Sequence, residues 1–179
     1  MLISPHKMQA DSINGISPIL RQHEKSKENM NRINVICLGV HDIVKARAFY
    51  RDGLGFTTPN NEEKPGVVFF SNGGTKLELY PLAALAKDIN ETNPPAIGTG
   101  FGGITLAFNA KTKEEVDAIF AKVESIGGKV AKRPETAFWG GYSGYIQDLD
   151  GYYWEIAYWD GWRFDENDML IIDEQLVDE

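Results

Sequence analysis

The chain has 179 residues, of which 42% are hydrophobic and 25% charged, a balance typical of one compact domain or two small ones. Its formal net charge of −8 argues against a general nucleic-acid binder and against a protein that lies on anionic membranes. A single cysteine, Cys37, excludes a disulfide or a cysteine-based zinc site within one chain. There are only three histidines, His6, His23 and His41, so histidine-based metal binding is restricted from the outset.

Both ends of the sequence differ from its centre. Residues 1–29 are polar and mixed in charge, which predicts a flexible N-terminal extension. They lack the apolar stretch of a signal peptide, and no run in the chain approaches the roughly 20 apolar residues of a membrane-spanning helix. We therefore expect a cytoplasmic protein.

The acidic charge is concentrated at the C-terminus. Residues 161–179 are predicted to be an acidic tail, and residues 160–179 together carry −7 of the total of −8. Such a run is usually solvated, although a role in binding a partner is an alternative. The apolar stretch 169–172 predicts that part of the tail docks on the body of the protein.

The centre of the chain begins with a predicted strand at 33–40, which is β-branched and mostly apolar. Asp42 is a typical N-cap, and the helix that follows presents one apolar stripe and ends at Gly53 and Gly55. Short strands are predicted at 56–58, 66–71 and 75–80, and the last two are joined by the hairpin signal Asn72-Gly73-Gly74.

The same pattern then occurs a second time, after a linking helix at 82–90 and a linker rich in proline and glycine. A strand at 103–109 leads into a helix with the capping box Thr112-Lys113-Glu114-Glu115 and the clearest apolar stripe of the chain. Strands follow at 129–132, 142–147 and 152–158, and Asp148-Leu149-Asp150-Gly151 is predicted to turn the last hairpin.

These elements predict an α+β fold of two tandem βαβββ modules, at about 32–82 and 100–160, within a domain at 30–160. One helix can cover only one face of each module's sheet. We therefore expect the modules to pair into a curved mixed sheet around a cleft, which is the expected ligand site.

Two motifs resemble the vicinal oxygen chelate superfamily, the glyoxalase/bleomycin resistance/dioxygenase group. The first is the segment Leu38-Gly39-Val40-His41-Asp42 with the later Gly53-Leu54-Gly55-Phe56, and the second is Asp148-Leu149-Asp150-Gly151-Tyr152-Tyr153-Trp154-Glu155. The segment 138–145 is similar to an uncharacterised branch of that group. The resemblance covers both modules and implies the fold, but it implies no single reaction.

Metal-dependent members of this group carry ligands on the first and last strand of each module, typically His or Gln on the first and Glu on the last. By resemblance, the last-strand positions correspond to Glu78 and Glu155, and the first-strand positions correspond to Val35 and Gly103, which offer no ligand. His41 lies at a turn beside Asp42, outside the ligand position. We expect no metal cofactor, because two carboxylates alone make a poor transition-metal site; a divalent ion with several waters is the less favoured alternative.

Strand alternation places Glu78 and Glu155 on the face opposite their apolar neighbours, which predicts that both glutamates face the cleft. They are the candidate catalytic residues and, with Tyr153, Trp139 and Tyr142, the candidate ligand-binding residues. The alternatives are that the glutamates pair with Lys76 or Arg133, or bond to water, and that the aromatic rings only seal the edge of the sheet. Cys37 is expected to be an inert packing residue, because no histidine lies in the sheet to activate it.

We expect a glyoxalase/bleomycin-resistance-like protein that binds a small organic ligand in the cleft without a metal, as the drug-sequestering members of the group do. The alternative is a lyase or isomerase of the glyoxalase type, in which Glu78 or Glu155 acts as a base or as a metal ligand. A third interpretation is an interaction module whose acidic tail is the working part. The expected partner is a small molecule rather than nucleic acid or a membrane, and the cleft closes either within one chain or across a homodimer.

Overall fold

The structure is a computed structural model that describes residues 31–172; the predicted N-terminal extension and residues 173–179 lie outside the described residues. The chain divides into residues 1–33 and residues 34–179, and the description below concerns the second unit. No helix in the part of the chain that the structure describes is long and apolar enough to cross a membrane.

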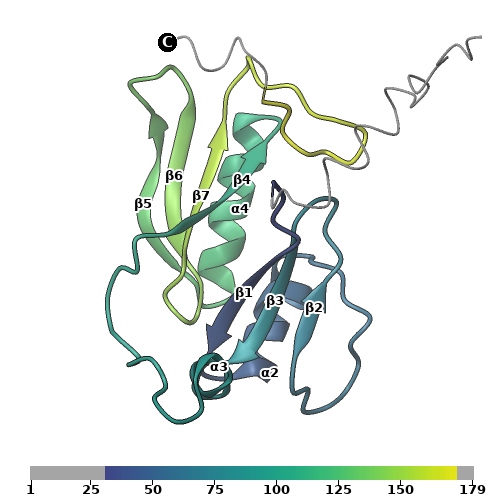
Figure 1. The fold of residues 1–179 in the computed structure, drawn as a ribbon. Helices are drawn as coiled ribbons and strands as arrows, with labels where there is room; N and C mark the ends of the chain where they lie inside the picture. The colour runs from purple at the N-terminus through teal and green to yellow at the C-terminus, as the bar shows by residue number, and fades with distance from the viewer. Residues whose placement is uncertain (1–30, 173–179) are drawn as a thin grey trace, which may run out of the picture. The chain divides into compact units, whose positions relative to one another are not determined.

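The first module contains three strands and a helical segment (Figure 1). Strand β1 (Val35–Val40) leads to helix α2 (Ile43–Ala48), which continues as a π-helical turn, η1 (Phe49–Gly53). The Asp42 side chain caps α2 as predicted, since its carboxylate accepts a hydrogen bond from the Lys45 backbone N–H. Strands β2 (Val68–Phe70) and β3 (Lys76–Pro81) form the predicted hairpin, and helix α3 (Leu82–Ile89) follows at once.

The second module repeats this order with one more strand. It comprises β4 (Thr105–Ala110), α4 (Lys113–Ser125), β5 (Lys129–Thr136), β6 (Tyr142–Gln147) and β7 (Tyr153–Tyr158). The capping box at the start of α4 is present, because the Thr112 side chain accepts a hydrogen bond from the Glu115 backbone N–H at 3.1 Å.

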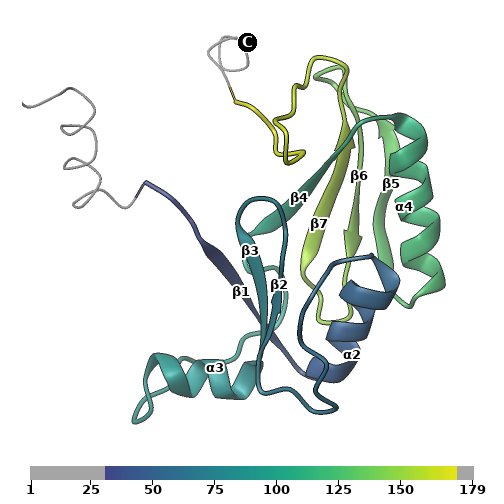
Figure 2. The same cartoon turned by 90° about the vertical axis from the view of Figure 1, so that its right-hand side faces the viewer.

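The predicted α+β fold of two modules is confirmed, with the strands in two sheets of order β1-β3-β2 and β4-β7-β6-β5. In each sheet the first strand of the module pairs in parallel with the last, so the two sheets share one topology. Helices α2 and α4 lie on one side of the sheets, whereas α3 lies on the other side of the first sheet (Figure 2). A single buried core contains residues of both modules.

Residues 56–58 form no strand, contrary to the sequence prediction. The Phe56 ring instead packs into the core beside Tyr50, Phe70 and Trp154. The Ser71 backbone N–H donates a hydrogen bond to the Thr57 carbonyl, and the Thr57 hydroxyl donates one to the Ser71 carbonyl. The short segment is followed by Pro59, which cannot extend a ladder of hydrogen bonds, so the first sheet has three strands.

The described part of the acidic tail makes contacts with the body. Phe164 and Leu170 pair as an antiparallel bridge, and Asp168 forms an ion pair with Lys111 at the end of β4. A Cβ placed on Gly74 of the β2–β3 hairpin would lie 2.5 Å from the Met169 methyl carbon, so Met169 packs directly on that turn. These contacts agree with the docking predicted from the apolar stretch 169–172.

Candidate functional site

The turn before β7 joins the two modules. The Asp148 carboxylate is buried and accepts a hydrogen bond of 2.5 Å from the hydroxyl of Tyr50, a residue of the first module. Trp154 donates to the same hydroxyl at 3.2 Å, and the Tyr152 hydroxyl donates to the Gly39 carbonyl at 2.9 Å. The turn predicted from Asp148-Leu149-Asp150-Gly151 therefore also holds the two modules together. The contacts of Tyr50, Asp148, Tyr152 and Trp154 are called the clamp below.

Burial dominates the electrostatics of this clamp. It raises the pKa of Asp148 above its ordinary value, although hydrogen bonds from Tyr50 and from the backbone act in the opposite direction. Burial and the negative charge of Asp148 hold the pKa of Tyr50 well above its usual range, so Tyr50 acts as a hydrogen-bond donor.

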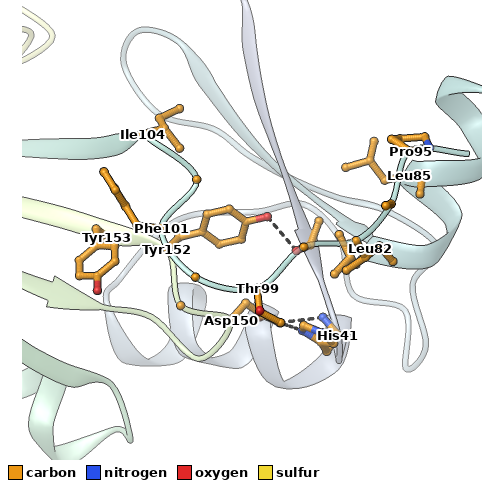
Figure 3. A pocket seen from close by; sticks show the side chains of 18 of the residues that line it. His41, Leu82, Leu85, Pro95, Thr99, Phe101, Ile104, Asp150, Tyr152 and Tyr153 are labelled. Carbon is orange, nitrogen blue, oxygen red and sulfur yellow. Dashed lines mark hydrogen bonds and ion pairs between the residues drawn. The ribbon is translucent and has the colours of Figure 1, made fainter.

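A cavity of about 560 Å³ lies beside the clamp, where the first module, the linker and the β6–β7 turn meet. We call it the junction cavity. Figure 3 shows His41 and Asp150 at one side, Leu82 and Leu85 of α3 at another, and Phe101 with Tyr153 at the far end. The size lies within the range of small-molecule sites in proteins.

The second hollow lies on the face of the β4–β7 sheet that α4 does not cover, called the open face here. It has a volume of about 610 Å³ and is lined by Phe101, Thr105, Ala131, Lys132, Tyr145 and Tyr153. The rings of Phe101 and Tyr153 meet edge to face, with centroids 5.6 Å apart. Because both residues also line the junction cavity, the two hollows share a wall.

Glu155 belongs to the open face, as strand alternation predicts. Its neighbours Trp154 and Ile156 are buried in the core, and β6 places Tyr145 directly opposite Glu155. Burial, the charge of Glu155 and a hydrogen bond to its carboxylate raise the pKa of Tyr145. Lys132 lies opposite Tyr145 on β5 and forms an ion pair with Glu135 at 2.8 Å; the hydrogen bond to Glu135 is the main cause of its raised pKa, and the charges of Tyr145 and Glu155 add to it. Glu155, Tyr145 and Lys132 are called the Glu155 cluster below.

Glu78 occupies the equivalent position in the first sheet, between the buried residues Leu77 and Leu79. Its strand neighbours are Cys37 on β1 and Phe69 on β2. Burial, followed by the charge of Glu78 and a hydrogen bond to it, raises the pKa of Cys37 to about 11. The thiol is therefore protonated at neutral pH, in agreement with the prediction of an inert cysteine.

The two ion pairs offered as alternatives for the glutamates are not formed. Arg133 pairs with Glu124 of α4, and the Lys76 ammonium donates to the Asn72 carbonyl. Both cations are therefore engaged elsewhere.

The donor set does not fit a transition-metal centre of the family type. The residues paired beside Glu78 and Glu155 on the first strands are Cys37 and Ala107. Within residues 31–172, no three side chains of His, Cys, Asp or Glu lie close enough together to hold a metal ion.

Three of the five candidate residues lie apart from Tyr153 and Glu155: Glu78, which is in the first sheet, Tyr142 and Trp139. The Tyr142 hydroxyl donates to Asp117 of α4 at 2.9 Å, which places this ring on the helix-covered side of the sheet. Trp139 lies in the β5–β6 turn, where it stacks on Trp162 with centroids 6.1 Å apart. Neither Tyr142 nor Trp139 lines either hollow; Glu155 does not line one directly either, but it lies on the open face beside Tyr145, which does. The structure thus groups Tyr153 with Glu155 and separates them from Tyr142 and Trp139.

Sequence reasoning missed His41 and Asp150 as partners. His41 was expected to be only a turn residue, yet its ring Nδ1 lies 2.9 Å from Asp150, 109 positions further along the chain. Sequence spacing alone carries no signal for such a pair, although both residues lie in the motifs that carried the family resemblance.

Comparisons with known proteins agree with this architecture. Residues 32–156 match the family model of the Glyoxalase/Bleomycin resistance protein/Dioxygenase superfamily. A glyoxalase-related enzyme from Fulvimarina pelagi is 25% identical with a TM-score of 0.71, over 80% of this chain and 99% of that one. A lactoylglutathione lyase from Agrobacterium tumefaciens is 27% identical with a TM-score of 0.57, over 76% and 100%.

A curated relative matches over a shorter stretch. The mitochondrial methylmalonyl-CoA epimerase of Bos taurus is 41% identical over 61 residues, which is 31% of this chain and 35% of the bovine protein. The match thus spans about a third of that relative. The family model covers most of the chain, and the two-module fold is shared with the solved structures. The chain belongs to the Glyoxalase/Bleomycin resistance protein/Dioxygenase superfamily.

Proposed function

We propose that this protein binds a small organic ligand on the open face of its second sheet. The observation that carries the proposal is the hollow lined by the Phe101–Tyr153 ring pair and by Lys132 and Tyr145, with Glu155 next to Tyr145 on the same face. Apolar walls with a few convergent polar groups are the usual composition of a small-molecule site. Aromatic rings would hold the flat or apolar part of the ligand, and the polar cluster would orient its hydrogen-bonding part.

The chemistry of the Glu155 cluster indicates what the ligand carries. Glu155 accepts hydrogen bonds, the Tyr145 hydroxyl donates and accepts them, and Lys132, which pairs with Glu135, has further N–H donors to offer. A molecule with a carbonyl or carboxylate beside a hydroxyl could accept a hydrogen bond from Lys132 and donate one to Glu155. We therefore propose an oxygenated organic acid or ketone with an apolar portion.

A thermal-shift screen of oxygenated metabolites, with and without divalent metals, tests the proposal, because a ligand of the native state raises its melting temperature. We expect stabilising compounds whose effect is lost in Tyr153→Ala and reduced in Glu155→Gln. Tyr142→Phe is the matched control, since Tyr142 lies on the other side of the same sheet. A hit that binds equally to wild type, Tyr153→Ala and Glu155→Gln would place the ligand elsewhere.

A second candidate function is an isomerase, favoured by the similarity to the bovine methylmalonyl-CoA epimerase. Here Glu155 would take a proton from the carbon next to a carbonyl, the electron pair would move to the carbonyl oxygen, and the carbon would then regain a proton. Glu78 is the other candidate base, but the structure places it beside Cys37 in the first sheet.

Deuterium uptake separates the two functions. In D₂O, an isomerase would exchange the α-hydrogen of methylmalonyl-CoA, and Glu155→Gln would slow this exchange by at least about a hundredfold, the lower end of typical acid–base contributions. Glu63→Gln, a change in an exposed loop, should leave the rate unaltered. Binding without exchange favours the first function, whereas exchange at the wild-type rate in Glu155→Gln excludes Glu155 as the base. The cytoplasmic location and a homodimer stay predictions.

A further inference from the structure

The junction cavity has features that ligand binding on the open face does not explain. Its walls are mainly apolar and come from helix α3 and from residues 94–103, which we call the strap. Several apolar side chains that line it are strongly exposed: Ile89 (67%), Phe101 (65%), Ile97 (53%) and Ile104 (52%). Single exposed apolar residues are ordinary, but a group around one cavity typically marks a binding site.

The strap makes few polar contacts with the rest of the described chain. Among residues 31–172, no hydrogen bond joins residues 94–103 to another part of the chain, and the nearest bonds before it are those that Asn90 accepts from Thr92 and Asn93. Its backbone N–H and C=O groups therefore have no hydrogen-bond partner among residues 31–172, and the segment can settle on a ligand without breaking any of the described bonds.

The polar end of the cavity is the pair His41–Asp150 (Figure 3). One Asp150 oxygen, Oδ1, accepts from the His41 backbone N–H at 2.7 Å and lies 2.9 Å from the His41 Nδ1. The Asp150 side chain is only 7% exposed, whereas that of His41 is 73% exposed. A buried carboxylate that is already held by a backbone N–H orients the imidazole ring from behind.

This arrangement fixes the role of the other ring nitrogen. A carboxylate accepts hydrogen bonds, so the neutral imidazole carries its proton on Nδ1, and Nε2 is left with a lone pair. Nε2 of His41 is thus an acceptor at the edge of an apolar cavity, suited to a hydroxyl or N–H donor.

The charges of the lining indicate a neutral ligand. Among the residues that the structure describes, Asp150 is the only acidic residue that lines the cavity, and no lysine or arginine lines it. An anionic head group would therefore meet a carboxylate without a permanent cation to offset it.

We propose that the junction cavity is a second binding site, which takes a neutral, largely apolar molecule whose hydroxyl or N–H group donates to Nε2 of His41. The apolar body lies against α3 and the strap, and the donor is held by the histidine that Asp150 orients. This site is separate from the Glu155 cluster, although both share the Phe101–Tyr153 wall.

Three probes with one ring system test the proposal by titration with the full-length protein: 1-naphthol, naphthalene and 1-naphthalenesulfonate. One added hydrogen bond is worth up to about tenfold in affinity, so 1-naphthol should bind several-fold tighter than naphthalene, and the sulfonate should bind weakest. His41→Ala should remove the preference for naphthol while leaving naphthalene binding unchanged. Equal affinity of wild type for naphthol and naphthalene, or a preference that survives His41→Ala, overturns the proposal.

A second variant tests the apolar wall. Leu85→Gln should weaken the binding of both naphthol and naphthalene, whereas the control Leu149→Gln, at an exposed leucine outside the cavity, should not. Undiminished binding to Leu85→Gln contradicts the assignment.

NMR tests the site without comparing the affinities of variants. The chain has only three histidines, so its imidazole C–H spectrum is simple, and the signal missing in His41→Ala identifies His41. We expect 1-naphthol to shift that signal, and no shift at saturation contradicts the site. Glu155→Gln should leave naphthol binding unchanged, so this proposal and the proposed function fail independently.

Discussion

At the scale of single residues, the clamp between the modules is the feature that sequence reasoning could not reach. The sequence predicts Asp148 in a hairpin turn, and Tyr50 lies in the predicted helix that follows Asp42. Both readings are correct locally, since Asp148 Oδ1 accepts from the backbone N–H groups of Asp150 and Tyr152 and Tyr50 is 1% exposed. Their contact across 98 positions depends on how the modules pack, which no local pattern encodes.

Removing the Tyr50 hydroxyl should destabilise the protein measurably. Tyr50→Phe leaves the buried Asp148 Oδ2 without its donor and the Trp154 indole N–H without its acceptor. Loss of a partner for buried polar groups costs about 1–3 kcal/mol, to be measured by urea unfolding. Tyr142→Phe is the control, because it removes a hydrogen bond of the same type, but an exposed one, and should cost under about 0.5 kcal/mol. Equal effects of the two variants would contradict the importance of the clamp.

The raised pKa of Asp148 predicts a pH dependence with a definite sign. A carboxyl whose pKa is higher in the folded than in the unfolded state favours folding in its protonated form, so its contribution is greatest at acid pH and is lost as pH rises through the folded-state pKa. The unfolding free energy of wild type relative to Asp148→Asn should therefore fall as pH rises above the ordinary aspartate range near 3.9. A difference that grows with pH would show that the hydrogen bonds outweigh burial.

At the scale of elements, the sequence predicted most helices and strands because their periodicity and caps are local. Strand β6 was predicted with its observed bounds, and the helix bounds differ by few residues. The missing strand at 56–58 shows the limit, because the apolar Phe56 is used in the core rather than in a ladder. Tyr142 shows a similar limit: its residue type suggested a ligand contact, whereas in the structure its hydroxyl donates to Asp117 of α4.

Strand β6 must lie close to both α4 and β5, and Gly144 permits this. A Cβ at Gly144 would lie 2.6 Å from the Lys132 carbonyl oxygen and 2.7 Å from the Phe120 ring. Gly144→Ala should therefore cost about 1–3 kcal/mol, as overpacking of a core typically does. Gly66→Ala, where the added methyl group would meet no atom within 4 Å, should unfold at the same urea concentration as wild type. A neutral Gly144→Ala would show that β6 and β5 separate easily.

At the scale of the whole described unit, the two modules share one hydrophobic core and should unfold together. The chain offers one probe in each module: Cys37 is its only cysteine, and all four tryptophans lie between positions 139 and 162. Thiol labelling and tryptophan fluorescence should give the same urea midpoint, as a two-state transition requires. If Cys37 becomes reactive well before the fluorescence changes, the first module unfolds on its own.

The candidate site could be predicted only in part from the sequence, because local patterns do not encode long-range packing. Strand parity gave the sheet faces of Glu78, Glu155 and Tyr153, but of these three residues only Tyr153 lines a hollow. The positions of the two hollows could not be predicted, because they depend on long-range packing and on the strap. The glycines and prolines of the strap show no periodicity that would indicate a helix or a strand. His41–Asp150 and Tyr145–Glu155 pairs therefore emerged from the structure alone.

Binding of a ligand on the open face is the central claim, and isothermal titration of a hit from the thermal-shift screen tests it most directly. The affinity for Tyr153→Ala should fall at least about tenfold, and that for Glu155→Gln about tenfold or more, because one variant removes an aromatic wall and the other a charged hydrogen-bond acceptor. Tyr142→Phe should bind as wild type does. If Tyr142→Phe weakens binding while Tyr153→Ala and Glu155→Gln do not, the ligand lies on the helix-covered side and the account is contradicted.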